Sequence, residues 1–349
     1  MSITKKSFGF MPDGREVFSY LLDNGKNVKA EIINYGGAVK SLWVKNKSGE
    51  YIDVVLGYDT LEEYFDNDAF FGVLVGRCGN RIKNSKFTLN GKEYNIGVND
   101  GKHSLHGGVS GFNKYLWDAK EIDDDKNPAL TLTMTSPDGD EGYPGNLSVK
   151  VTYTLNELDG LCISYEATTD KDTIVNLTNH SYFNLNGEGS GDIKDMTLDL
   201  SCSYYTPADD DCVTTGEILA VDGAFDLRGG KKIGNALAKE HPQTKKFEGF
   251  DNNFIIDGRG VRKAATLWGD TTGITMYLFT DAPGMQIYSG NKIDDKRKCK
   301  GGKCYPKYGG ICLETQNFPN AINYGHFPSP ILKAGEKYKY SAEYRFSVV

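Results

Sequence analysis

Apolar and polar side chains alternate along most of this chain, which has 349 residues. The clearest case is KYKYSAEYRFSVV at residues 337–349, where every second side chain from Tyr338 to Val348 is apolar or aromatic. A period of two predicts a β-strand with one buried face. The same period occurs in the runs 16–35, 87–96, 130–136, 147–155, 161–169 and 274–281. We therefore expect an all-β protein.

Turn signals separate these runs. The pairs Asn24-Gly25 and Asn90-Gly91 predict two-residue hairpin turns, because both central residues of such a turn must accept a positive φ. Asp159-Gly160 joins two further strands, and the helical candidates at 61–64 and 235–240 are short. No linker, low-complexity tract or repeat of 20 to 50 residues interrupts the pattern. The sequence predicts one large antiparallel β-sandwich domain over residues 1–349.

Charge and cysteine content narrow the possible partners. The chain has 40 basic and 47 acidic residues, a net charge of −7, which does not attract a phosphate backbone, so we expect no nucleic-acid partner. No run of 18 apolar residues occurs, so we expect no membrane span. The start MSITKKSFGF lacks the apolar segment of a secretory signal, and the seven scattered cysteines resemble reduced thiols. These features predict a cytoplasmic protein.

Common cofactor and metal motifs are missing. The chain has no phosphate-binding G-x-x-x-x-G-K-[ST], no strand-bound G-x-G-x-x-G and no G-x-S-x-G. The glycine-rich KGGKC at 300–304 lacks the spacing to cradle phosphates, and we expect a mobile loop there. His103 and His106 could share an ion only on a helix, which Gly107-Gly108 disfavour, and Cys299, Cys304 and Cys312 lack paired partners. We predict neither a cofactor nor a metal.

Polar residues in strand-rich segments remain as candidates for chemistry. Each of them, taken alone, can be explained by an ordinary structural role. Glu314 is harder to explain in that way, because it directly follows the apolar Ile311-Cys312-Leu313 and a buried carboxylate needs a partner. The segments concerned are GRCGNRI (Arg77, Asn80, Arg81), HSLHGG (His103, His106), NHSYFNL (Asn179, His180, Tyr182, Asn184), GFDNNF (Asp251), GMQIYSGN (Gln286) and CLETQNFPNA (Glu314, Gln316).

In this order, the segments resemble the aldose 1-epimerase (galactose mutarotase) family. The resemblance is carried by NRI, SLHGG, TNHSYFNL, YYTPADD, GEI, GFDNNF and CLETQNFPNAIN, and it extends from INYGGAV to KYKYSAEYRFSV near the end. It implies a large single-domain β-sandwich, which agrees with the alternation. Gly79 stands where alanine is common in the family, and Asn252 follows the aspartate where other polar residues often occur.

The resemblance also implies an activity and its residues. Members interconvert the α and β anomers of free hexoses such as galactose and glucose by acid/base ring opening and closure, without a cofactor. His180 would then be the general acid at the ring oxygen, Glu314 the base at the C1 hydroxyl, and His106 an assistant at the ring oxygen. The other implied residues are Asn80, Arg81, Asp251 and Gln286, which would hold sugar hydroxyls, and Tyr182, Phe183 and Asn184, which would shape the pocket wall.

The residue types suit that chemistry on their own. A carboxylate of pKa ~4.3 and an imidazolium of pKa ~6.5 are both in the required state between those values. Activity at pH 7 would need a neighbouring carboxylate to raise the pKa of the histidine, or the field of the carboxylate to be shared between both groups. We expect a small aldohexose as partner and a monomer or weak homodimer. The lysine- and cysteine-rich segment 292–310 could edge the pocket and influence substrate preference.

Three alternatives stay open at this point. A carbohydrate-binding member could keep the fold without the catalysis, although it would not need both His180 and Glu314. An enzyme for a phosphorylated hexose or another lactol would want extra cations, and Arg77 and Arg81 are the ones near the motifs. A glycosidase needs two carboxylates, which Asp251 and Glu314 could supply, but His180 would then have no purpose.

Overall fold

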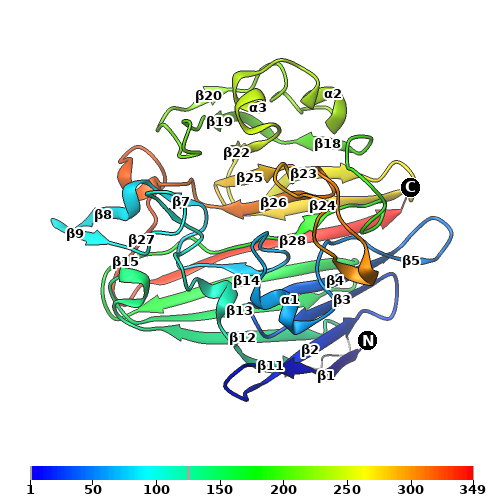
Figure 1. Ribbon diagram of the computed structural model, residues 1–349, viewed down its shortest axis with the longest axis horizontal. Coiled ribbons are helices and arrows are strands. Elements are labelled where there is room, and N and C mark those ends of the chain that lie inside the picture. Colours follow the sequence, from blue (N-terminus) through cyan, green and yellow to red (C-terminus); the bar gives the residue numbers. More distant parts are fainter. Residues whose placement is uncertain (1, 123, 125, 349) are drawn as a thin grey trace.

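The computed structural model describes residues 2–122, 124 and 126–348, and its longer strands form three antiparallel sheets (Figure 1). The five-stranded sheet contains, in order, β1 (Ser2–Phe10), β2 (Glu16–Asp23), β3 (Val28–Ile33), β4 (Val39–Lys45) and β5 (Tyr51–Asp53). The nine-stranded sheet contains β11 (Asp118–Ile122), β12 (Ala129–Ser136), β13 (Leu147–Leu155), β14 (Gly160–Thr169), β28 (Lys337–Val348), β24 (Ile274–Thr280), β23 (Arg262–Trp268), β18 (Thr197–Leu200) and β21 (Lys231–Lys232).

The six-stranded sheet is the one that matters most for the site. It contains, in order, β17 (Tyr182–Phe183), β26 (Ile311–Gln316), β25 (Gly284–Tyr288), β22 (Asp251–Ile256), β19 (Cys202–Thr206) and β20 (Leu219–Ala220). Short two-stranded pairs complete the described fold: β6 (Leu74–Val75) with β16 (Thr178–Asn179), β7 (Arg81–Ile82) with β10 (Ser104–Leu105), β8 (Lys86–Leu89) with β9 (Lys92–Asn95), and β15 (Thr173–Ile174) with β27 (Ile331–Leu332).

The alternation at the end of the chain does form a strand. β28 pairs with β14 on one side and β24 on the other, so it lies inside the nine-stranded sheet. Its side chains Tyr340, Ala342, Tyr344 and Phe346 are buried, whereas the residues between them are less so. Every other alternating run in the sequence also forms strands, and the prediction of an all-β antiparallel fold is confirmed.

The hairpin predictions are confirmed with one correction. Asn90 and Gly91 both have positive φ and connect β8 to β9 by the expected two-residue turn. Asn24 and Gly25 also lie in a hairpin, but the connection runs from 24 to 27 and only Gly25 of the pair has a positive φ. The Asn24 side chain explains the longer turn, because its oxygen accepts the backbone N–H groups of residues 26 and 28.

Helices are short, as expected, and one was missed. α1 (Leu61–Phe65) matches its prediction, and α2 (Ile233–Leu237) begins two residues before the predicted segment. The missed helix is α3 (Pro242–Phe247), which begins after His241. The His241 side chain accepts the N–H of Gln243, and a proline at the first helical position is pre-set for a helix. No helix among the described residues is long and apolar enough to cross a membrane.

One apolar core joins the three sheets. Buried side chains of the five-stranded, nine-stranded and six-stranded sheets belong to the same cluster, as Ala30, Val151 and Leu313 illustrate. Phenol groups of β28 reach across it: Tyr344 donates to the carbonyl of Leu313 at 3.0 Å. The core therefore fixes β26 from behind, which is the strand that carries Glu314.

We expect the substitution Leu313→Ala to lower the free energy of unfolding by about 2–5 kcal/mol, because it opens a cavity in that core. Urea unfolding followed by circular dichroism measures this loss. The matched control is Leu158→Ala, a leucine that is 61% exposed and should change stability by less than about 0.5 kcal/mol. Equal losses in the two variants would contradict the placement of Leu313 in the core.

Candidate active site

A cavity of about 390 Å³ opens beside the six-stranded sheet, a size typical of small-molecule sites. Eight of the ten residues predicted for the site line it, and they come from segments far apart in the sequence. These eight are Asn80, Arg81, His106, His180, Tyr182, Asp251, Gln286 and Glu314.

Strand alternation explains how the sheet supplies the polar side of this cavity. In β26, Leu313 faces the apolar core, so its neighbour Glu314 faces the cavity. Glu314 is in register with Gln286 of β25, and Asp251 of β22 lies one strand further along. The Gln286 amide donates to the Asp251 carboxyl at 2.7 Å, so the two side chains hold each other in place.

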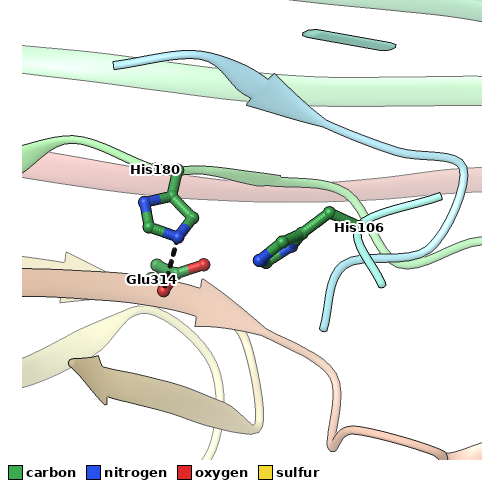
Figure 2. Close-up of side chains that lie close together, drawn as sticks. All are labelled: His106, His180 and Glu314. Carbon is green, nitrogen blue, oxygen red and sulfur yellow. Dashed lines mark ion pairs between the residues drawn. The ribbon is translucent and has the colours of Figure 1, made fainter. Parts of the chain in front are cut away.

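The backbone that follows β16 places His180 next to Glu314. The His180 N–H donates to the carbonyl of Val73 and its carbonyl accepts from the N–H of Gly72. The imidazole Nε2 then lies 3.6 Å from Oε1 of Glu314, as Figure 2 shows. Both side chains are almost fully buried. The pair therefore meets in a place that excludes most water.

His106 completes the group from a tight turn locked to Asn80. The backbone N–H of His106 donates to the carbonyl of Asn80 at 3.1 Å, and the N–H of Asn80 donates to Nδ1 of His106 at 3.2 Å. Since Nδ1 accepts a hydrogen bond, a neutral His106 carries its proton on Nε2. Burial, with His180 and Arg81 nearby, holds the pKa of His106 well below its ordinary value. The residue is therefore a neutral N–H donor.

The same three side chains raise the question of a metal. The ligand atoms of His106, His180 and Glu314 lie within 4.8 Å of one another. A histidine that binds a metal usually donates its second ring N–H to an acceptor. His106 instead accepts an N–H at Nδ1, which leaves the proton on Nε2. The group is thus better arranged for proton donation than for holding an ion.

Burial shifts the pKa values of His180 and Glu314 in opposite directions. Loss of water lowers the pKa of His180 to about 4, and a hydrogen bond to its own carbonyl opposes that shift. Burial, together with the nearby Asp251, raises the pKa of Glu314 well above its ordinary value, against the pull of Arg81. The neighbouring carboxylate therefore does not raise the pKa of His180 in this cavity, because desolvation is the larger effect.

Two residues that line this cavity each have a buried side-chain oxygen with no hydrogen-bond partner among the described residues. The atoms are Oε2 of Glu314 and Oε1 of Gln286. Buried polar atoms are nearly always hydrogen-bonded, so orphan acceptors on a cavity wall indicate a ligand that donates. Hydroxyl groups are such donors. Arg81 adds donors at the same wall, with its Nε held 2.6 Å from Asp100.

Comparison with known proteins identifies the family of this chain. Residues 19–345 match the family described as Aldose 1-epimerase. The chain belongs to the aldose 1-epimerase family. It is 41% identical to the galactose mutarotase of Sus scrofa over all of this chain and 99% of that protein. It is 33% identical to the aldose 1-epimerase of Escherichia coli (strain K12) over 96% of each chain.

Solved structures of similar proteins have the same fold. The galactose 1-epimerase from Lactobacillus acidophilus NCFM superposes with a TM-score of 0.88 at 28% identity, covering 99% of this chain and 98% of that one. The GalM/aldose epimerase homologue from C. elegans gives a TM-score of 0.87 at 30% identity, covering 95% of this chain and 99% of that one. The epimerase-family fold is therefore shown by both sequence and structure.

Two residues predicted for the pocket wall lie elsewhere in this epimerase-family chain. Phe183 packs in the core against Tyr344, with ring centroids 5.0 Å apart. Asn184 is fully buried, and its amide donates to the carbonyls of Gly191 and Gly309. For Phe183 the reason is alternation along β17, which turns Tyr182 to the cavity and its neighbour Phe183 to the opposite face.

Sequence reasoning also missed the aromatic side of the epimerase-family cavity. Phe70 is stacked on His180 at 5.8 Å between ring centroids and lies 4.7 Å from His106. Asn67 holds this turn, since its side chain bonds both the N–H and the carbonyl of Phe71. The DNDAFF stretch was the available signal. The further lining residues are Tyr58, Asp68, Ala69, Phe71, Leu105 and Tyr288.

The lysine- and cysteine-rich segment does edge the cavity. It contributes the lining residues Lys292, Ile293, Asp294, Arg297, Cys299 and Tyr305. The KGGKC stretch, expected to be a mobile loop, is instead tied to the rest of the fold. Lys300 is buried and its ammonium lies 2.9 Å from both the Asp53 carboxyl and the carbonyl of Val55. A buried ion pair of this kind anchors the cavity edge to the five-stranded sheet.

Proposed function

We propose that the protein interconverts the α and β anomers of a free aldohexose, such as galactose or glucose, by acid/base ring opening and closure. The observation that carries the proposal is the contact of 3.6 Å between His180 Nε2 and Glu314 Oε1 inside a cavity of sugar size. An acid and a base at this distance can give a proton to one oxygen of an anomeric carbon and take a proton from the other. Membership of the aldose 1-epimerase family supports the same conclusion.

The reaction needs one proton on the pair. In ring opening, Glu314 takes the proton of the C1 hydroxyl and His180 gives a proton to the ring oxygen, while the bond from C1 to the ring oxygen breaks and the aldehyde C=O forms. Rotation about C1–C2 exposes the other face, and closure reverses both transfers. The step begins from the form of the pair with the proton on His180 and ends with the proton on Glu314 in the open-chain state, so no exchange with solvent is required.

Burial favours the protonation state of the pair that accompanies the open-chain sugar. A dry cavity disfavours imidazolium and carboxylate and stabilises the neutral imidazole and carboxylic acid. That neutral pair is the state which accompanies the open-chain aldehyde. The shifts thus lower the energy of the intermediate relative to the charged starting state, which is how a site stabilises what forms during reaction.

The other cavity residues have roles suited to a pyranose. His106 donates its Nε2 hydrogen to the ring oxygen, and Arg81 and Asn80 donate to or accept from hydroxyl groups. Asp251 and Gln286 accept hydroxyl protons from the sheet side of the cavity. Phe70 offers an apolar surface beside the two histidines. A few placed polar groups and an aromatic face are the usual make-up of a small-ligand site.

A phosphorylated hexose fits the cavity less well than a neutral one. Arg77 is buried outside the cavity, with its guanidinium donating to carbonyl groups that include those of Ser136 and Pro144. Arg81 is paired with Asp100. Arg297 donates to carbonyls of Glu63 and Asp66 and lies over the ring of Tyr58. Arg77 and Arg297 are thus occupied by carbonyl groups and the charge of Arg81 is balanced by Asp100, which favours the neutral sugar.

A non-catalytic carbohydrate-binding protein remains the second candidate. Such a protein needs hydroxyl-binding groups but has no use for an acid and a base in contact, with a carboxyl oxygen left without a partner. The same contact weakens the glycosidase alternative, in which Asp251 and Glu314 would act and His180 would have no role. Polarimetry separates the candidates, because a binding protein does not hasten mutarotation.

We further propose that residues 1–349 act as one domain in the cytoplasm, as a monomer or weak homodimer whose partner is a small aldohexose. All seven cysteines are free, which suits a reducing compartment.

The substitution Glu314→Gln should lower kcat by about 10²–10⁴-fold, because it removes the base while keeping the shape of the side chain. Polarimetry of freshly dissolved α-D-galactose and α-D-glucose measures the rate. Since a neutral side chain suits this buried position, the variant should fold normally by circular dichroism. Glu343→Gln, on β28, is the control and should keep the parent rate. A Glu314→Gln enzyme as fast as the parent would remove Glu314 from the mechanism.

The pH profile of kcat/KM should have a broad plateau that extends to about pH 4 on the acid side. The pair is active while it holds one proton, and it gains a second only when pH falls through the pKa of His180, which is about 4. It loses its last proton only above the raised pKa of Glu314. His180→Asn should abolish the acid limb. An acid limb near pH 6.5 in the parent, or the same limb in the variant, would contradict the assignment.

A further inference from the structure

Both nitrogen atoms of the His180 ring have a partner on the same strand. Glu314 and Cys312 are two residues apart in β26, so they project from the same face of the sheet. Oε1 of Glu314 lies 3.6 Å from Nε2, and Sγ of Cys312 lies 3.5 Å from Nδ1. Cys312 is completely buried and is not part of the cavity wall. It can act on a sugar only through His180.

Aromatic rings around His180 fix the plane of its imidazole. They do not determine which ring positions are occupied by nitrogen and which by carbon. Phe70 is stacked against His180, and the rings of Tyr182 and His106 pack around it at 5.1 and 5.2 Å between centroids. A half-turn of the imidazole about its Cβ–Cγ bond would keep much of this packing and would exchange nitrogen for carbon. A polar group beside Nδ1 distinguishes the two orientations, because sulfur can hydrogen-bond to a nitrogen site and gains little from a C–H group.

We propose that Cys312 is a positioning residue for the general acid: its thiol holds Nδ1 of His180 and so keeps Nε2 turned to Glu314 and the sugar. This inference rests on the proposed function. A thiol is both a weak donor and a weak acceptor, so it can contact Nδ1 with or without a proton. A carboxylate in its place would stabilise the imidazolium by charge and oppose the release of its proton.

The surroundings keep that thiol neutral. Burial and the nearby Glu314 raise the pKa of Cys312 well above its ordinary value, so it does not become a thiolate beside the ring. The titratable groups that face His180 are Glu314 and Cys312 from β26, Tyr182 from β17, Tyr288 from β25 and His106 from the turn after β10.

The test compares Cys312→Ala and Cys312→Ser with the parent. Losing the contact with Nδ1 lets the ring turn, so Cys312→Ala should lower kcat on α-D-galactose on the order of tenfold with little change in KM. Cys312→Ser restores a donor and acceptor and should recover much of that loss. ¹⁵N NMR of labelled histidine should show a moved Nδ1 resonance of His180 in both variants. Cys202→Ala is the matched control, since Cys202 is equally buried but lies on β19, and it should change neither readout.

Two results would overturn the proposal. One is a Cys312→Ala enzyme with parent kcat and an unmoved His180 resonance. The other is an equal loss of kcat in the alanine and serine variants with that resonance unmoved, which would mean that Cys312 only fills space. If the alanine variant does not fold, the serine variant decides, because an unmoved Nδ1 resonance in it contradicts the contact. A parent that fails to hasten mutarotation would refute the proposed function, while the resonance would still report on positioning.

Discussion

The contact between His180 and Glu314 in a dry cavity is the interaction on which the remaining features depend. In water, a carboxylate and an imidazolium would form an ordinary ion pair near neutral pH. Inside the cavity, burial lowers the pKa of His180 to about 4 and raises that of Glu314, which stabilises the neutral imidazole and carboxylic acid relative to the charged pair. The one proton that the pair holds can then pass between the two groups, which is what reversible ring opening and closure require.

The fold holds His180 and Glu314 close to each other and also keeps water away from them. Glu314 is fixed by β26, whose other face is buried in the core and held by the hydroxyl of Tyr344. His180 is fixed by backbone hydrogen bonds to residues 72 and 73, beside the two-stranded pair of β6 and β16. Phe70 covers the two histidines, and the segment anchored by Lys300 closes another edge. Glu314 is thus held by a strand and His180 by the backbone beside β16, and loops cover the pair.

Local pattern was enough to predict the strands, because alternation is a property of neighbouring residues. The final strand and the Asn90-Gly91 turn were both predicted correctly. The same rule would have separated Tyr182 from Phe183, since consecutive residues of a strand face opposite sides, but the family motif was treated as one block. Phe70 and Cys312 could not be found in this way, because their contacts with His180 arise only when distant segments pack together. The direction of the His180 pKa shift depends on burial, which the sequence does not reveal.

The most direct test of the central claim is an NMR titration of the pair in the sugar-free protein. Labelled carboxyl carbon of Glu314 and ring nitrogens of His180, assigned with the Glu314→Gln and His180→Asn variants, report where the proton lies. The account predicts that the pair keeps one proton between pH 5 and 7, with Glu314 not ionising near its ordinary pKa and His180 not titrating near 6.5. Independent titration of both groups at their ordinary values would contradict it.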